Sequence, residues 1–302
     1  MVLSAGDKRA GSASQVTLIS CTLTLESHRN PVSLPENPVP VYPPLPESPA
    51  TPPAPLALPD ENPSWSGWEV LALAVITFVV LVGCVVGTAF FVHRRFSPAS
   101  PMVESLKRPE VIVGGQLLAY FLVLLVMYAM VSSQNNGRVL GAVRWNWPQN
   151  WGVYLLAGIA LELCLVPFAY LLPMPKHAPI DDFFRTARDA YVLSLFGVFF
   201  APLFEEVFFR GFVYPVLARR LRMIPAIVIT ALCFAAIHAS QLKYSWGPVL
   251  VIFLVGIALT TVRAVKKSVA ATVLMHMAYN GSIFIAAYIA TGGFRHMEKF
   301  NQ

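Results

Sequence analysis

Long apolar runs separated by short charged loops dominate the chain after about residue 66, and this pattern predicts membrane-spanning helices. Most of the runs are long enough to cross about 30 Å of hydrocarbon at 1.5 Å per residue. The seven runs are residues 70–92, 111–131, 151–172, 190–217, 223–242, 246–262 and 268–291. The sixth run is short and could be partly embedded, so six or eight spans remain open. The predicted fold class is all-α, a polytopic transmembrane helical bundle of about seven helices.

The segment before the first run has the opposite character. Residues 31–63 contain 13 prolines among 33 residues. Proline fixes φ and has no backbone N–H, so we expect an extended, disordered spacer of the polyproline-II kind. The pattern divides the chain into a disordered Pro-rich tail (residues 1–66), accessory transmembrane helices (67–189) and a second transmembrane domain (190–292) that holds the candidate site residues.

The composition supports a membrane protein. Of the 302 residues, 56% are hydrophobic and 13% are charged, whereas soluble domains carry about a quarter charged residues. We therefore expect an integral, multi-pass protein, located in the plasma (inner) membrane. The net charge of +6 comes from basic residues in short loops. We therefore expect membrane lipid to be a partner, and we expect no binding of nucleic acid. Basic loops nearly balance across the two sides, so the orientation stays open. The four cysteines stand alone, which supports neither a disulfide nor a cysteine metal site.

Two adjacent carboxylates and an arginine lie inside the fourth apolar run. Ionisable groups at membrane depth cost at least ~2.5–3.5 kcal/mol each, so they mark function by default. Glu205 and Glu206 project about 100° apart around a helix, and Arg210 follows Glu206 by one turn, where an ion pair can form. Glu205 would then remain free to act as a general base that activates water. The structural alternative is a helix-stapling Glu206–Arg210 pair with Glu205 at an interface.

Three more polar residues lie on later helices. His238 is near the end of the fifth run, where a single histidine is more often structural than catalytic. His276 and Asn280 are one turn apart on the last run and share a helix face, so they could present two donors to one oxygen atom. Alternatively, each could bond across a helix interface without any catalytic role. Glu162, the one further charge that this interpretation places inside a span, lacks any surrounding motif and is taken as structural.

These residues form three ordered motifs on separate helices. Residues 205–210 read EExxxR, residues 234–238 read FxxxH and residues 276–280 read HxxxN. Each motif alone is weak, but the ordered trio resembles the CAAX-processing and bacteriocin-immunity (CPBP) family of intramembrane proteases, which includes the type II CAAX prenyl endopeptidases. The resemblance covers roughly residues 192–289, and the tail and first helix lie outside it.

The resemblance implies peptide-bond hydrolysis inside a helical bundle. The substrate would be a protein or peptide, with or without a lipid modification. The roles that it implies are water activation by Glu205 and His238, oxyanion stabilisation by His276 and Asn280, and support of the acid pair by Glu206 with Arg210.

The need for a metal is a separate question. One glutamate and two histidines could bind zinc as a His₂Glu set, and such an enzyme would be described as a metalloprotease. The HExxH helix motif is missing from the sequence, and a glutamate-base scheme uses every residue without zinc, so we expect no cofactor. Two other functions remain open. One is a non-catalytic peptide-immunity or membrane-assembly protein; the other is a transporter, for which we find no internal repeat.

Overall fold

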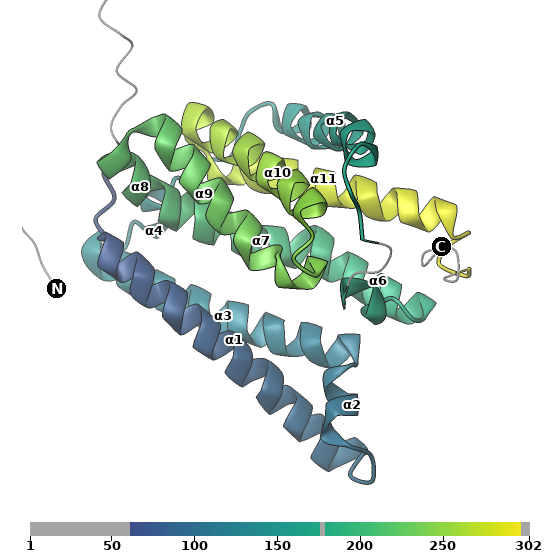
Figure 1. Ribbon diagram of the computed structural model, residues 1–302. Coiled ribbons are helices and arrows are strands. Elements are labelled where there is room, and N and C mark those ends of the chain that lie inside the picture. Colours follow the sequence, from purple (N-terminus) through teal and green to yellow (C-terminus); the bar gives the residue numbers. More distant parts are fainter. Residues whose placement is uncertain (1–60, 176–178, 297–302) are drawn as a thin grey trace, which may run out of the picture. The chain divides into compact units, whose positions relative to one another are not determined.

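The computed structural model describes residues 61–175 and 179–296. Most of the Pro-rich tail, residues 1–60, lies outside the described residues. Within the described part of the chain every regular element is helical, which confirms the predicted all-α class (Figure 1).

Within residues 61–175 and 179–296, six helical stretches are long and apolar enough to cross a membrane. The structure is therefore that of a multi-pass integral membrane protein. Five are single helices: α1 (Gly67–Phe96), α3 (Pro109–Gln134), α5 (Trp151–Tyr170), α10 (Trp246–Lys266) and α11 (Val269–Ala290). The sixth, Ala187–Leu221, is a 35-residue succession of helical segments. Four short elements lie between the longer helices: α2 (Met102–Leu106), α4 (Val139–Ala142), η1 (Pro179–Phe183) and η4 (Ser240–Leu242).

A seventh apolar helix, α9 (Met223–His238), has 16 residues. The six long stretches and α9 together match the expected number of about seven. The expectation that the run at residues 246–262 would be the short one is wrong, because α10 extends to Lys266 and has 21 residues. The fifth run is the short one instead, since α9 ends at His238 and is followed by the separate turn η4.

The composite stretch contains two π-helical segments. Its order is α6 (Ala187–Leu195), the π segment η2 (Phe196–Phe200), α7 (Ala201–Glu206), the π segment η3 (Val207–Val213) and α8 (Tyr214–Leu221). A π turn inserts an extra residue into the helix and is frequent at functional sites. Here the two π segments flank α7 on either side.

Close packing brings the helices of the bundle together. In Figure 1, α1 and α3 run side by side with α2 between their ends, α10 lies along α9, and α5 lies along α11. Gly158 on α5 allows the last of these contacts, because a Cβ there would lie 2.1 Å from the carbonyl oxygen of Met275. Glycine at such a position lets two helix backbones approach closely in a membrane.

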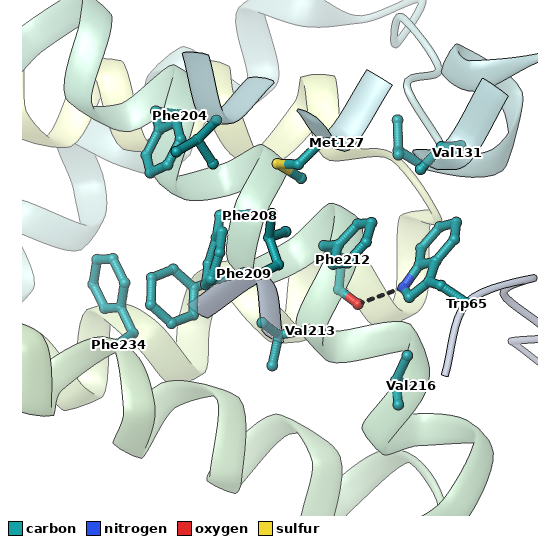
Figure 2. Packing of buried hydrophobic residues seen from close by; sticks show 13 residues of the cluster. Trp65, Met127, Val131, Phe204, Phe208, Phe209, Phe212, Val213, Val216 and Phe234 are labelled. Atoms are coloured by element: carbon teal, nitrogen blue, oxygen red, sulfur yellow. Dashed lines mark hydrogen bonds between the residues drawn. The ribbon is translucent and has the colours of Figure 1, made fainter. Parts of the chain in front are cut away.

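The first described residues pack against the bundle. Trp65 is fully buried, its ring stacks on Phe212 at a centroid distance of 4.6 Å, and its Nε1 donates to the Phe212 carbonyl at 3.0 Å (Figure 2). Ser66 then caps α1, accepting from the backbone N–H of Glu69. The expected tail boundary at residue 66 is therefore too late, because residues 61–66 belong to the packed structure. We call residues 61–66 the N-terminal strap.

Candidate active site

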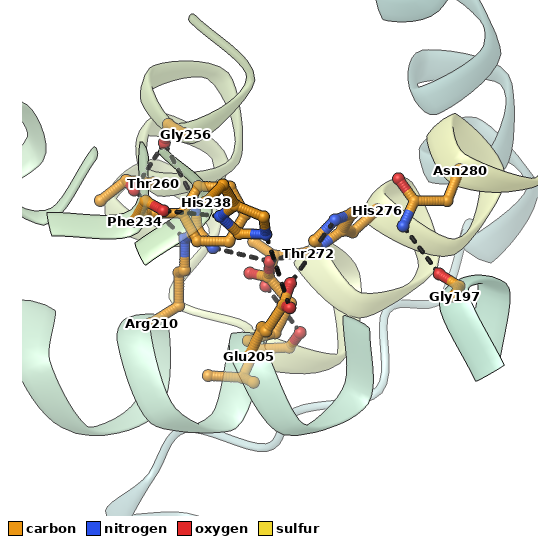
Figure 3. A network of polar contacts seen from close by, with 12 residues as sticks. Gly197, Glu205, Arg210, Phe234, His238, Gly256, Thr260, Thr272, His276 and Asn280 are labelled. Atoms are coloured by element: carbon orange, nitrogen blue, oxygen red, sulfur yellow. Dashed lines mark hydrogen bonds and ion pairs between the residues drawn. The ribbon is translucent and has the colours of Figure 1, made fainter. Parts of the chain in front are cut away.

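Glu206 and Arg210 form a buried ion pair, as the i,i+4 spacing predicts. Arg210 Nη1 donates to Glu206 Oε1 at 2.7 Å, and both side chains are fully buried. The other guanidinium nitrogens donate to α10, Nε to Thr260 Oγ1 and Nη2 to the Gly256 carbonyl, both at 3.2 Å. The Arg210 guanidinium also stacks over the ring of Phe234 on α9, 4.5 Å from its centroid. The arginine thus joins η3 to two neighbouring helices (Figure 3).

His276 approaches the same carboxylate from α11. Its Nδ1 lies 2.8 Å from Glu206 Oε1, and the histidine is 4% exposed. Because this carboxylate accepts from Arg210 as well, it is ionised, and Nδ1 of His276 is the donor of the bond. Glu206 therefore fixes both the ring orientation of His276 and the nitrogen that carries its proton.

His238 is oriented in a comparable way by its own helix. Its Nδ1 donates to the Phe234 carbonyl at 2.8 Å, one turn earlier in α9. A carbonyl can only accept, so the proton of the neutral ring lies on Nδ1 and the lone pair on Nε2. The Phe234 ring packs beside both histidines, at centroid distances of 4.9 Å from His238 and 5.8 Å from His276.

The Nε2 atoms of both histidines face Glu205. The separations are 3.8 Å from His238 Nε2 to Glu205 Oε1 and 3.9 Å from His276 Nε2 to Oε2. With Nδ1 protonated in both rings, two imidazole lone pairs and a carboxylate converge, and all three groups accept hydrogen bonds when Glu205 is ionised. These distances are too long for direct hydrogen bonds. The arrangement suits a small molecule that lies between the three groups and donates hydrogen bonds to them, such as water.

Asn280 makes a contact that the sequence did not predict. Its Nδ2 donates to the carbonyl of Gly197 in η2 at 2.7 Å (Figure 3). One Asn280 N–H is thus engaged with Gly197 and His276 Nδ1 with Glu206, so a convergence of the two side chains on one oxygen would use the second Asn280 N–H and His276 Nε2. An amide nitrogen has two hydrogens, so one Asn280 N–H remains for another acceptor.

Four of the six predicted site residues line one cavity of about 420 Å³, namely Glu205, His238, His276 and Asn280. Aromatic and aliphatic side chains form most of the remaining wall, including Tyr120, Phe184 and Phe284. Glu206 and Arg210 do not line this cavity and lie behind its wall. The motif residues therefore divide into side chains that face the cavity and side chains that position them from behind.

The donor set does not match a closed zinc site. Two ligands at 2.0–2.1 Å from a tetrahedral zinc ion lie about 3.4 Å apart. The two Glu205–histidine separations are 3.8 and 3.9 Å. Within the described residues, no cluster of three or more His, Cys, Asp or Glu side chains is arranged to hold a metal ion.

Sequence reasoning missed two charged residues near the site. Arg263 on α10 is fully buried, and its Nη1 and Nη2 donate to Glu61 of the strap at 2.7 and 3.2 Å. The predicted apolar run ends at residue 262 and leaves Arg263 just outside it. Arg263 lies three residues after Thr260 and so on the same helix face. This spacing was the signal that could have placed Arg263 inside the helix and near Arg210. Glu162, by contrast, lies on α5 and does not line the cavity.

The fold and the cavity define a polytopic membrane protein in which Glu205 and two histidines face one another beside the fully buried Glu206. The model of one protein family, described as type II CAAX prenyl endopeptidase Rce1-like, matches residues 187–282. The match contains all three motifs and agrees with the resemblance to the CPBP family of intramembrane proteases that they indicate, over residues 187–282. No curated protein and no solved structure matched the chain.

Proposed function

We propose that the protein is an intramembrane endopeptidase that hydrolyses a peptide bond near the membrane surface. One observation carries the proposal: Glu205 faces the Nε2 atoms of two histidines whose Nδ1 atoms are already engaged. Such a cluster of acceptors, inside a largely apolar cavity, suits a water molecule that is to be deprotonated.

Glu205 is the general base in the proposed reaction. It takes a proton from water, which His238 orients through Nε2, and the hydroxide attacks the substrate carbonyl carbon. Glu205 then returns the proton to the amide nitrogen as the C–N bond breaks, giving an amine and a carboxylic acid, which keeps the second proton of the water until it ionises in solvent. No external oxidant, reductant or cofactor is required, since the proton that leaves water is the one that the leaving amine gains.

The oxyanion that forms on the carbonyl oxygen needs donors. Asn280 supplies the N–H that Gly197 does not use. His276, whose Nδ1 is bound to the Glu206 carboxylate, lines the same cavity and is assigned to the oxyanion site through its Nε2 edge. Arg210 keeps Glu206 ionised and in place.

The proposed substrate is a protein or peptide whose cleaved end enters the cavity from the membrane. Its apolar wall is compatible with a lipid-modified segment. A fluorogenic prenylated CAAX-type peptide and its unprenylated counterpart, assayed in lipid bilayers, separate the two kinds of substrate.

The central test compares wild-type protein with Glu205→Gln and His238→Ala in that assay. A positioned general base contributes about 10²–10⁴-fold, so each variant should lose activity to that extent while remaining folded. Glu162→Gln is the matched control, because it also removes a carboxylate from a membrane-spanning helix but lies outside the cavity. Turnover above about a tenth of wild type in Glu205→Gln would exclude Glu205 as the base.

A further inference from the structure

Each π segment next to the acid pair is followed, two residues after its end, by a proline that interrupts its hydrogen bonds. In η2, the N–H of Ala201 donates to the Phe196 carbonyl, five residues back. The next bond of this series would join residue 202 to Gly197, but residue 202 is proline and has no N–H. The N–H of Ala201, which an α-helix would give to Gly197, is already used. The Gly197 carbonyl is thus left without a donor from its own helix.

The same arrangement recurs in η3, which carries the catalytic-site arginine. There the N–H of Tyr214 donates to the Phe209 carbonyl, again five residues back. The next donor in the series would be residue 215, which is also proline. The Arg210 carbonyl therefore lacks a main-chain partner within its helix, in a segment whose side chains are buried.

A side chain from another helix satisfies each of these carbonyls. Asn280 Nδ2 donates to Gly197 O at 2.7 Å, and Arg263 Nε donates to Arg210 O at 3.0 Å. A buried carbonyl without a partner costs about 1–3 kcal/mol, and at membrane depth there is no bulk water to replace the donor. The two side chains thus stabilise main-chain geometries that would otherwise be unfavourable.

Arg263 is itself held from a second direction. Both terminal nitrogens bind the Glu61 carboxylate, a two-pronged pairing that fixes the guanidinium plane. The strap also reaches η3 directly, through the bond from Trp65 Nε1 to the Phe212 carbonyl. The strap and α10 therefore both donate hydrogen bonds to η3, the strap to the Phe212 carbonyl and α10 to the Arg210 carbonyl.

We propose that Arg263 is a positioning residue for the reaction: by capping the Arg210 carbonyl it fixes η3, and through η3 the Arg210 guanidinium that holds Glu206 and His276. The catalytic part of this inference rests on the proposed function, whereas the capping of η3 does not. Arg263 does not line the cavity; it bonds the main chain of Arg210, and its guanidinium also lies over the Tyr214 ring, 5.4 Å from the centroid.

The test isolates the cap from the ion pair. Glu61→Gln leaves the buried Arg263 without its countercharge, which should lower stability, but keeps its bond to Arg210 O, so kcat is compared on the folded protein. The double variant Glu61→Gln/Arg263→Met removes the cap without leaving an unpaired buried charge, which would endanger folding. Adding Pro215→Ala to the double variant supplies the missing N–H at the next position of the π series.

Two kinds of measurement are made on each purified variant. Steady-state kinetics give kcat and KM for cleavage of the substrate peptide, and amide hydrogen exchange is followed in residues 207–214 of the protein. Misplacement of a catalytic group by about 1 Å can cost about 10²-fold, so the double variant should lose at least about tenfold in kcat at nearly unchanged KM. Exchange in residues 207–214 should accelerate, while α5 exchanges as before. Glu61→Gln should stay within about threefold of wild-type kcat, and Pro215→Ala should restore the double variant to a similar level and slow its exchange.

Wild-type kcat and exchange in the double variant would overturn the proposal. So would a lowered kcat that Pro215→Ala does not restore, because Arg263 would then act by another route. If wild-type protein cleaves no peptide, the proposed function fails, and the exchange measurement alone still decides whether Arg263 caps η3.

Discussion

The Nδ1 atom of His276 lies 2.8 Å from Oε1 of Glu206, although the two residues are 70 positions apart in the chain. The same oxygen accepts from Arg210 at 2.7 Å, so one carboxylate oxygen joins α7, η3 and α11. A fully buried carboxylate with two charged or polar donors gives this part of the bundle its geometry. Glu205, the neighbouring residue, faces the cavity instead.

The adjacent glutamates should therefore respond differently to the same substitution. Glu206→Gln removes the countercharge of the fully buried Arg210, and breaking a buried pair from one side costs about 3–5 kcal/mol. Glu205→Gln removes no such partner and should leave the free energy of unfolding nearly unchanged while abolishing turnover. Reversible unfolding in mixed micelles measures the first quantity and the peptide assay the second.

The exposed Glu104–Lys107 pair provides a control for loss of an ion pair as such. Glu104→Gln should change the stability by no more than about 1 kcal/mol. A Glu206→Gln protein as stable as wild type would show that Arg210 does not depend on this carboxylate.

Asn280 has two proposed contributions, one to the oxyanion and one to the Gly197 carbonyl. If it donates to the developing charge, Asn280→Ala should lower kcat by about 10²–10³ with little change in KM. Asn280→Asp should be at least as damaging, because a carboxylate repels the oxyanion and cannot donate to Gly197. Steady-state kinetics on folded, size-selected protein measure both effects.

Pro202→Ala separates the two contributions of Asn280. It restores an N–H for Gly197 without supplying a donor to the substrate. We expect the Asn280→Ala/Pro202→Ala protein to regain stability but not kcat. Recovery of full kcat, or a normal kcat in a merely destabilised Asn280→Ala protein, would remove Asn280 from the oxyanion site.

Activity should survive metal chelation. The Glu205–histidine separations exceed those of tetrahedral zinc ligands, and the proposed glutamate mechanism uses each residue without a metal. Incubation with excess chelator should leave kcat unchanged, with zinc-saturated chelator as the matched control, and purified protein should contain substoichiometric zinc. Loss of activity that added Zn²⁺ restores would establish the metalloprotease mechanism.

Truncation should have little effect up to residue 60 and a large effect beyond it. Deletion of residues 1–60 keeps Glu61 and Trp65, so stability and cleavage of a small peptide should remain essentially intact. Deletion of residues 1–66 also removes a fully buried tryptophan, whose loss costs about 3–5 kcal/mol, and leaves Arg263 without Glu61. Thermal unfolding and the peptide assay on both truncations test this difference.

Trp65→Ala in the full-length chain is the internal control for the longer deletion, since it removes the ring alone. A collapse of activity in the shorter deletion despite normal stability would show that residues 1–60 deliver substrate or control access to the cavity.

The sequence by itself determined the features that depend on local spacing. Apolar runs of membrane length predict helices because every backbone polar group must be bonded within the span. The Glu206–Arg210 pair follows from residues one helical turn apart, and the three ordered motifs indicated the resemblance to the family whose model matches residues 187–282. Helix ends were less accurate: α10 extends past residue 262 because a charged residue, Arg263, can be buried when the strap supplies a partner.

Only the tertiary structure decided which partner each polar group has. Asn280 could have bonded to any acceptor that its helix face meets, and its donation to Gly197 requires both the π turn of η2 and a proline five residues later. Likewise, the burial of Trp65 and the capping of Arg210 by Arg263 join segments that are distant in sequence. A hydrophobic pattern specifies that a helix is buried, but the neighbour that it packs against determines where each donor points. That neighbour is set by the packing of the whole bundle.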